Sequence, residues 1–388
     1  MSTGVKWIIG LVVAVIVLWG GWALLAPSDT VDEPVVAEET EPEPIRIGFI
    51  GPLTGDAAAY GEPGQKVTAL AVTEINEAGG INGRMLEVIY EDGKCNGKDA
   101  ASAMQKLVNV DKVQVVLGGF CSGESLAAAP IANANKVLLF SQGSSSPDLT
   151  DAGDYFFRDY PSDASQGKVL AEVAYNTKEW RKVAVIQEQL DYPLGVYNAF
   201  NEAFTELGGE VVRETFAPET SDFRTVLTKL EKEDADALLV SVQTPAAAEI
   251  ILKQMGDIEW ETNLLGVDII AGSDLPAEQP ELVEGMIVAE FGVDESNEIY
   301  QKFVAAYEAA YEEEVPFKSY AQAEYDAVNL LAKALTEVGD NGEALQKWFS
   351  EMDSFDGASG SVSFDEKGDR TIGHRAEVIE DGEVKLLE

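Results

Sequence analysis

After residue 44 the chain alternates short runs rich in β-branched residues with longer amphipathic stretches. Short apolar runs bounded by turn residues are typical of buried strands, and apolar positions spaced by three and four are typical of helices. Regular alternation of the two predicts a parallel sheet with crossover helices. The first such set has predicted strands at residues 45–50, 86–90, 113–117 and 137–140, and predicted helices at residues 64–78, 98–110 and 122–134.

A second set of the same kind follows. Its predicted strands are residues 183–187, 210–215, 237–241, 263–267 and 286–290, and its predicted helices are residues 193–207, 222–232 and 245–255, with another near Leu282. Two such sets predict an α/β chain with two Rossmann-like, doubly wound lobes. The later elements are helices at residues 297–313, 320–338 and 343–349 and strands near residues 361–364 and 376–379. These helices do not form a third domain, so we expect them to return to the first lobe.

Several chain crossings between two lobes make a hinge. Lobes joined in this way can rotate toward each other but cannot separate, which is the mechanics of a ligand clamp. In open α/β sheets the ligand lies beyond the carboxyl ends of the strands. The residues that directly follow the predicted strands are therefore the candidates for ligand contact.

The N-terminal 26 residues predict a membrane segment. Trp7 to Ala26 is a stretch of 20 residues without a charge, preceded by Lys6 and followed by acidic residues. Such a run can span the hydrocarbon layer as a helix with the N-terminus in the cytoplasm. The alternative is a cleaved signal peptide ending at Leu24-Leu25-Ala26. In both cases the remaining chain is exported, either anchored at the outer face of the cytoplasmic membrane or periplasmic or secreted.

The charge of the chain is strongly negative. The formal net charge is −42, of which residues 1–26 carry +1 and residues 27–44 carry −7, leaving −36 on residues 45–388. A surface this negative repels phosphate backbones, which excludes nucleic acid as a partner. Residues 27–44 are acidic and hold four prolines, so we predict a disordered linker there.

Two cysteines, Cys95 and Cys121, fit an oxidising compartment. An even number suggests a bridge, which would stabilise the fold by about 3 kcal/mol in the chain-entropy model. Two free buried thiols are the alternative.

Small and hydroxylated residues follow two predicted strands of the first lobe. Ser122 comes after the strand at residues 113–117 and begins a helix, whose free N–H groups suit a carboxylate. Gly143, Ser144 and Ser145 come after the strand at residues 137–140. Each segment alone is also explained as an ordinary helix cap or turn. Together they suggest a carboxylate site, with the Gly143 carbonyl open to an ammonium.

Asp268 follows the strand at residues 263–267 in the second lobe. Facing the cleft, its carboxylate would pair with a positive ligand group, although a lone aspartate after a strand is often a turn residue. Tyr60, in the loop after the first strand, would form a wall of the pocket or cover the sheet edge.

At these residues the chain resembles the type I solute-binding proteins of branched-chain amino acid ABC transporters, which bind leucine, isoleucine and valine. The similarity runs from Ile45 to near Glu388. The blocks that carry it are IRIGFIGPLTGDAAAYGEPG, INEAGGINGRMLEVIYEDGKC, VVLGGFCSGES, SSSPDL, FRDYPSDASQG, VAVIQEQLDYPLG, DFRTVLTKL, YAQAEYDAV and FDEKGDR.

The resemblance implies three crossovers, at about Tyr160, Phe291 and Arg375. Residues 45–160 and 291–374 would form the first lobe, and residues 161–290 and 375–388 the second. It also implies a Cys95–Cys121 disulfide, a ligand carboxylate held by Ser122 and Ser145, and a ligand ammonium held by Gly143 and Asp268. The residues that it places around the ligand side chain are Tyr60, Phe120, Ser144, Tyr192, Gln243 and Tyr320.

Three positions depart from the family pattern. Gln243 stands where relatives have an aromatic residue, Asp268 replaces a longer glutamate, and the loop at residues 192–195 reads Tyr-Pro-Leu-Gly. A buried glutamine needs a hydrogen-bond partner, so Gln243 suggests a ligand with a polar group or a bound water. The ligand is therefore expected to be a branched-chain or related amino acid, polar ones included, with a small amide or carboxylate as the alternative.

The sequence argues against an enzyme, a metal site or a cofactor. The one histidine, His374, lies beside the expected hinge, and neither a His/Cys cluster nor a GxxxxGK[ST] loop is present. We expect a monomer that delivers its ligand to an ABC permease and its ATPase. A membrane-anchored, ligand-sensing co-receptor built on the same clamp is the alternative.

Overall fold

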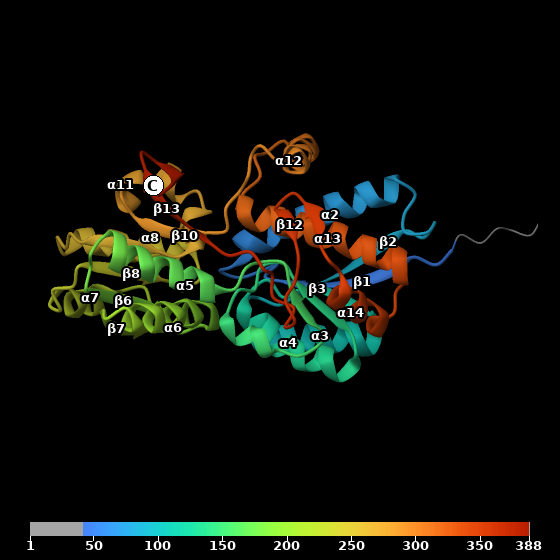
Figure 1. The fold of residues 1–388 in the computed structure, drawn as a ribbon, viewed down its shortest axis with the longest axis horizontal. Coiled ribbons are helices and arrows are strands. Elements are labelled where there is room, and N and C mark those ends of the chain that lie inside the picture. Colours follow the sequence, from blue (N-terminus) through green and yellow to red (C-terminus); the bar gives the residue numbers. More distant parts are fainter. Residues whose placement is uncertain (1–41, 388) are drawn as a thin grey trace, which may run out of the picture. The chain divides into compact units, whose positions relative to one another are not determined.

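The computed structural model describes residues 42–387. The expected membrane segment and nearly all of the expected acidic linker lie outside this range. Within residues 42–387 no helix is both long and apolar enough to cross a membrane. The described chain contains two main sheets, and Figure 1 shows them in separate halves of this part of the molecule.

The first sheet has five strands in the order β2-β1-β3-β4-β5, and all of its neighbours are parallel. Strands β1, β3 and β4 are buried almost throughout, as expected for a parallel sheet covered on both faces. The bounds are β1 (Ile45–Gly51), β2 (Leu86–Asp92), β3 (Val115–Gly118), β4 (Leu138–Ser141) and β5 (Phe156–Arg158).

Helices from both ends of the chain cover this sheet. One face packs on α2 (Ala58–Glu77), α13 (Lys318–Val338) and α14 (Gly342–Glu351), through a core that includes Phe140, Val328 and Phe349. The other face packs on α3 (Gly97–Lys106) and α4 (Ser122–Asn135) through Met104 and Ala128. The elements that complete this half are α12 (Glu298–Tyr311), β11 (Phe355–Gly357), β12 (Gly360–Val362) and the short turns η1 (Leu107–Asp111) and η2 (Pro147–Asp151).

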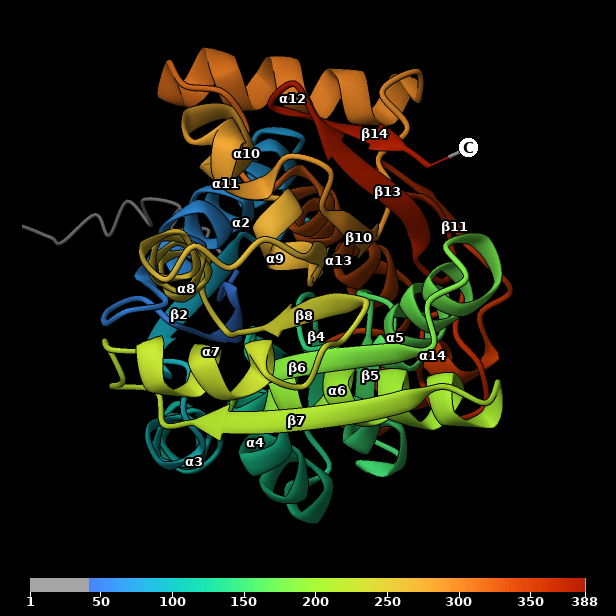
Figure 2. The same cartoon turned by 90° about the vertical axis from the view of Figure 1, so that its left-hand side faces the viewer.

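The second sheet has seven strands in the order β14-β13-β10-β9-β8-β6-β7. The last two strands of the chain run antiparallel at its edge, and the others are parallel. Figure 2 shows β7, β6 and β8 side by side. The bounds are β6 (Lys182–Glu188), β7 (Glu210–Phe216), β8 (Ala237–Ser241), β9 (Asn263–Gly266), β10 (Ile287–Glu290), β13 (Arg375–Glu380) and β14 (Glu383–Leu386).

Helices cover both faces of the second sheet as well. Helices α5 (Asp163–Glu172) and α6 (Asp191–Glu206) share one core with it, and α7 (Arg224–Glu231) and α8 (Pro245–Asp257) share another. Side-chain caps fix several starts: the Ser162 hydroxyl accepts from Ala164, and Thr244 accepts from Ala247 at the start of α8. The remaining elements are η3 (Val173–Thr177), α9 (Asp268–Ala271), α10 (Leu275–Glu278) and α11 (Pro280–Val283).

The chain passes between the two halves in three places, at residues 159–162, 291–297 and 371–374. Buried ion pairs join the chain at the start of the first passage to the two residues directly before the third. Arg158 bonds to Asp369 at 2.7 Å, and Arg370 bonds to Asp159 at 2.7 Å with both side chains fully buried. The Tyr160 ring lies 5.5 Å from the Phe291 ring and 6.1 Å from the His374 ring between centroids, so all three passages are in contact.

The predicted α/β architecture with two lobes is confirmed, and each strand predicted from the pattern is present within a few residues. The pattern missed β5, β11, β14, α5 and the short helices α9 and α10. One boundary was wrong: α2 begins at Ala58, six residues before the predicted start, and Pro63 lies inside it. Tyr60 is therefore a helical residue, because Gly61 lets the first turn of α2 lie directly against the Pro52 carbonyl.

Candidate functional site

The carboxyl ends of β3, β4 and β8 and the segment after β9 meet at one cavity between the lobes. Eight of the ten residues expected to contact a ligand line it, together with Cys121 and Ile269. The cavity has a volume of about 10 Å³, which is enough for one water molecule. Its lining residues are Tyr60, Phe120, Cys121, Ser122, Gly143, Ser145, Tyr192, Gln243, Ile269 and Tyr320.

Ser122 is the first residue of α4, and its hydroxyl accepts the N–H of Ser146 at 3.1 Å. The two serine segments therefore form one buried corner, at a helix start whose N–H groups have no helical partners. Behind this corner the Glu124 carboxylate accepts the N–H groups of Cys95 and Cys121, both at 2.9 Å. Burial raises the pKa of Glu124 to about 7, although these backbone N–H groups act in the opposite direction.

Gly143 lies against the ring of Phe120. A Cβ atom at this position would come within 2.7 Å of the ring, so only glycine leaves the ring and the backbone in place. Ser144, in contrast, does not line the cavity. Its hydroxyl donates to the carbonyls of Gly119 and Phe120 and pairs with the Ser125 hydroxyl, so it supports the loop from behind.

Asp268 lies behind the cavity and is fully buried. Its carboxylate accepts hydrogen bonds from the hydroxyls of Tyr160 at 2.7 Å, Tyr320 at 3.0 Å and Tyr192, and from the N–H of Ile269 at 2.8 Å. Burial and the Asp268 charge raise the pKa of all three tyrosines well above the usual value, so their hydroxyls remain donors. Within residues 42–387 the carboxylate has donors but no cationic partner.

Two further buried carboxylates, which the sequence did not single out, lie near Asp268. Asp163 begins α5, and its N–H donates to the Ser145 carbonyl at 2.8 Å; Glu290 ends β10. Neither carboxylate has a hydrogen-bond partner of standard geometry among the described residues. Burial, and secondly the Asp268 charge, raise the pKa of both well above the usual value. The closed end of the site thus holds three carboxyl groups, of which Asp163 and Glu290 favour the protonated, neutral form.

His374, the one histidine, lies in the third passage beside this end of the site. Its Nδ1 pairs with the Ser165 hydroxyl at 2.6 Å, and burial lowers its pKa to about 4. The imidazole is therefore neutral at physiological pH and does not balance the buried carboxylates. Its position in the hinge agrees with a structural role.

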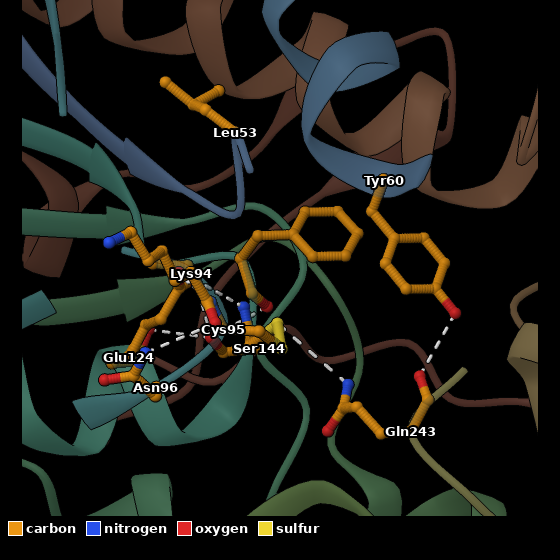
Figure 3. The surroundings of a disulfide bond; sticks show 12 residues. Leu53, Tyr60, Lys94, Cys95, Asn96, Glu124, Ser144 and Gln243 are labelled. Atoms are coloured by element: carbon orange, nitrogen blue, oxygen red, sulfur yellow. Dashed lines mark hydrogen bonds between the residues drawn. A yellow bond between two sulfur atoms is a disulfide. The ribbon is translucent and has the colours of Figure 1, made fainter. Parts of the chain in front are cut away.

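Gln243, Tyr60 and Cys121 of the disulfide form another part of the cavity wall. Figure 3 shows the Tyr60 hydroxyl directed at the backbone carbonyl of Gln243, at 3.1 Å, which links the two lobes. The Gln243 N–H donates to Glu188 at 2.8 Å. The amide of its side chain reaches only the sulfur of Cys121, at 4.0 Å, which leaves it free to bind a polar group in the cavity.

Cys95 and Cys121 form a disulfide with Cα atoms 5.2 Å apart. It joins the loop after β2 to the loop after β3, directly before Ser122. The bridge implied by the resemblance is therefore present, and free thiols are excluded. Among residues 42–387 no group of His, Cys, Asp and Glu side chains is arranged to hold a metal ion.

Comparison with known proteins gives consistent results. A family model described as Periplasmic binding protein matches residues 44–380. A leucine-, isoleucine-, valine-, threonine-, and alanine-binding protein of Pseudomonas aeruginosa is 26% identical over 327 residues, covering 84% of this chain and 87% of that protein.

Two solved structures share the fold and a quarter or more of the aligned residues. A leucine binding protein from Thermotoga maritima has a TM-score of 0.81 and 27% identity, covering 89% of this chain and 98% of that chain. A branched-chain amino acid transporter substrate binding protein from Streptococcus pneumoniae, solved with isoleucine, has a TM-score of 0.79 and 30% identity, covering 89% of this chain and 99% of that chain.

Proposed function

Because this chain belongs to the periplasmic binding protein family, we propose that it captures an α-amino acid outside the cytoplasm for an ABC importer. The named relatives bind leucine, isoleucine, valine, threonine or alanine, and the structure from Streptococcus pneumoniae holds isoleucine. The proposal concerns binding without catalysis. Its central element is the head group that these amino acids share.

Asp268 carries this proposal. A carboxylate that is fully buried is strongly disfavoured unless a cation or several donors offset the lost hydration. Three tyrosine hydroxyls supply the donors, and within the described residues no basic side chain supplies the charge. The α-ammonium of an amino acid is the missing partner, and the Gly143 carbonyl would accept its second hydrogen bond.

The carboxylate of the ligand would bind at the serine corner. Ser122 and Ser145 both line the cavity, and the first turn of α4 presents N–H groups and the positive end of a helix dipole. This arrangement places the anion-binding groups on the first lobe and the anionic Asp268 on the second. A zwitterionic head group matches both, whereas a simple amide or carboxylate matches only one.

Gln243 would select the side chain of the ligand. Gln243 lines the cavity, and among the described residues its amide has no partner closer than the Cys121 sulfur. Among the residues named for the Pseudomonas aeruginosa relative, threonine carries a hydroxyl that this amide would bind. We therefore infer a preference for a small polar side chain over a purely aliphatic one of similar volume.

Ligand entry would require the lobes to separate, because the cavity has the room of about one water molecule. The rigid bodies would be residues 45–160 with 291–374 and residues 161–290 with 375–388, rotating about the three passages. The closed form would then dock, as a monomer, on a permease driven by its ATPase. The segment at residues 1–26 would hold the protein at the outer face of the membrane, and residues 27–44 would serve as the linker.

Calorimetry with purified full-length protein tests this function. The protein is unfolded and refolded to remove carried ligand, and is then titrated with neutral α-amino acids and with analogues that lack either the ammonium or the carboxylate. Micromolar or tighter binding that needs both groups is the expected result. Equal binding of a simple carboxylate would remove the ammonium role of Asp268, and no binding by any α-amino acid would overturn the function.

A further inference from the structure

A second cavity of about 10 Å³ lies beside the first, between the N-terminal halves of α2 and α13. The two cavities share the rings of Tyr60, Phe120 and Tyr320, which form the partition between them. Like the first cavity, the second has the room of one water molecule, and therefore of one ammonium group, which has the same number of heavy atoms.

The carboxylate of Glu324 forms part of the wall of this second cavity. Glu324 is 1% exposed, and its Oε1 accepts a hydrogen bond from the Thr68 hydroxyl. Its Oε2 faces Gly64, whose hypothetical Cβ atom would lie 3.5 Å away, and among the described residues it has only the Gln142 amide beside it, without a hydrogen bond of standard geometry. A buried carboxylate oxygen without a well-aligned donor is costly, so a donor in the cavity would stabilise it.

Aromatic rings surround the same space. Tyr60 stacks on Phe120 with ring centroids 5.5 Å apart, Phe317 packs on Tyr60 at 4.9 Å, and Tyr320 packs on Phe120 at 5.2 Å. Ring faces attract a cation and have little attraction for an anion. The carboxylate and the rings therefore favour the same kind of occupant, a small cation with N–H donors.

The second cavity is also connected to the head-group site through the backbone. Gln142 directly precedes Gly143, and its side chain is fully buried beside Glu324. Neither its amide nitrogen nor its amide oxygen has a standard hydrogen bond among the described residues. One glutamine side chain thus separates Glu324 from the carbonyl expected to bind the α-ammonium. The net charge of −42 adds a general attraction for cations.

We propose that the cavity beside Glu324 is a subsite for a second cationic nitrogen of the ligand, so that the protein takes α-amino acids whose side chain ends in an ammonium group. This deepens the proposed function and rests on it. The side chain would pass the shared rings of Tyr60, Phe120 and Tyr320. Burial raises the pKa of Glu324 to about 8, with Thr68 and the nearby Gln142 amide acting in the opposite direction, and an ammonium beside it favours the ionised carboxylate.

Pairs of ligands that differ only in the terminal group test the subsite. Ornithine and norleucine have side chains of equal length, with an ammonium in one and a methyl group in the other; 2,4-diaminobutyrate and norvaline form a second pair. Calorimetry on the refolded full-length protein should show that a basic member binds at least tenfold more tightly than its methyl counterpart. Equal or weaker binding of both basic members would overturn the subsite.

Two variants locate the effect at this cavity. Glu324→Gln removes the charge, and Gly64→Ala adds a methyl group in ordinary contact with Oε2 within a helix, where alanine is favoured. Each should reduce the affinity for the basic member at least tenfold and change the Kd of its methyl counterpart less than twofold. Glu308→Gln, an exposed substitution of the same charge on α12, should change neither.

The outcomes also separate this inference from the function on which it rests. Tight binding of leucine or threonine with no binding of basic amino acids would overturn the subsite and leave the proposed function intact. Loss of affinity for basic and neutral ligands alike in Glu324→Gln would show a structural role of Glu324 and overturn the subsite. A failure of every α-amino acid to bind would overturn both.

Discussion

The rings of Tyr160 and Tyr320 are parallel within 2° and stacked with centroids 4.2 Å apart, although one residue lies in the first passage between the lobes and the other in α13. Both donate their hydroxyls to the same oxygen of Asp268. A residue of the hinge, a residue of the first lobe and the proposed ammonium site of the second lobe are thus joined in one contact. A ligand ammonium bound at Asp268, as proposed, would therefore be coupled directly to the arrangement of the lobes.

Replacement of the Asp268 charge should weaken ligand binding strongly. Asp268→Asn keeps the shape of the side chain but leaves the ammonium of the ligand without a counter-charge, and we expect a loss of about 2–5 kcal/mol in binding free energy. Calorimetry with the best α-amino acid ligand measures it. Asp268→Glu keeps the charge and should recover part of the affinity, and unchanged affinity of Asp268→Asn would remove the head-group assignment.

Substitution of Gln243 should change selectivity without disturbing the lobe contact. Its hydrogen bond to Tyr60 of the first lobe and its hydrogen bond to Glu188 within the second lobe both use its backbone atoms. Gln243→Leu should therefore shift the ratio of threonine to valine affinity toward valine by about tenfold, the equivalent of about 1.4 kcal/mol for one lost hydrogen bond. The same ratio before and after the substitution would show that the amide does not contact the ligand.

Loss of the disulfide should destabilise the fold. The bridge closes a sequence separation of 26 residues, and we expect Cys95→Ser with Cys121→Ser to lower the free energy of unfolding by about 3 kcal/mol. Urea unfolding measures this change. A reducing agent should produce a similar decrease in the native protein and none in the double variant; equal stability of both proteins would contradict the prediction.

The ion pair of Arg370 and Asp159 should be essential to the hinge. Both side chains are fully buried, so Arg370→Met leaves a carboxylate without a counter-charge, at an expected cost of about 3–5 kcal/mol in the free energy of unfolding. Lys229→Met breaks an exposed pair with Glu214 and should cost less than about 1 kcal/mol. Similar losses in the two variants would show that burial of the first pair is unimportant.

Stability should fall as pH rises above neutrality. Burial raises the pKa of Glu124 to about 7 and that of Glu324 to about 8, whereas both titrate near 4 in the unfolded chain. Between these values the folded state holds protons that the unfolded state has lost, so the free energy of unfolding decreases through this window and levels off above it. From pH 6.5 to 8.5 we expect these two groups to cost at least about 2 kcal/mol, on the order of one proton over 1.5 units, and Asp163 and Glu290, whose pKa values burial also raises, add to this loss.

Urea unfolding at several pH values measures this dependence. His374, whose pKa burial lowers to about 4, acts in the opposite direction only below pH of about 6.5, so it does not enter the chosen interval. Glu324→Gln should reduce the slope by the share of one titrating group and leave the contribution of the other buried acids. A stability that stays constant or increases from pH 6.5 to 8.5 would contradict the assignment of these buried acids.

The fold and the serine corner could be predicted because their signals are local. Each strand is a short apolar run, and in a parallel sheet the residues after neighbouring strands, such as Ser122 and Ser145, must meet at one edge. The start of α2 was misplaced because proline commonly opens a helix, whereas here Pro63 lies within one.

The closed end of the site could not be predicted in the same way. Tyr160 was expected only as a crossover, and Asp163 and Glu290 were not singled out. Each of these residues follows or ends a strand next to a passage between the lobes. Their proximity to Asp268 depends on how three passages that are distant in the sequence pack together, and this packing cannot be predicted from residue spacing. The proximity of Gln142 and Glu324, which are 182 positions apart in the sequence, was missed for the same reason.

The three passages also bear on the biosynthesis of the protein. One face of the first sheet is covered only in part, by α2, until α13 and α14 have emerged, and the second sheet lacks β13 and β14 until residues 375–386 are available. Neither lobe can thus complete its core while the C-terminal part of the chain is still being made. We therefore expect late folding, with apolar strands exposed during synthesis, and a truncation that removes α14 and all that follows would damage both lobes at once.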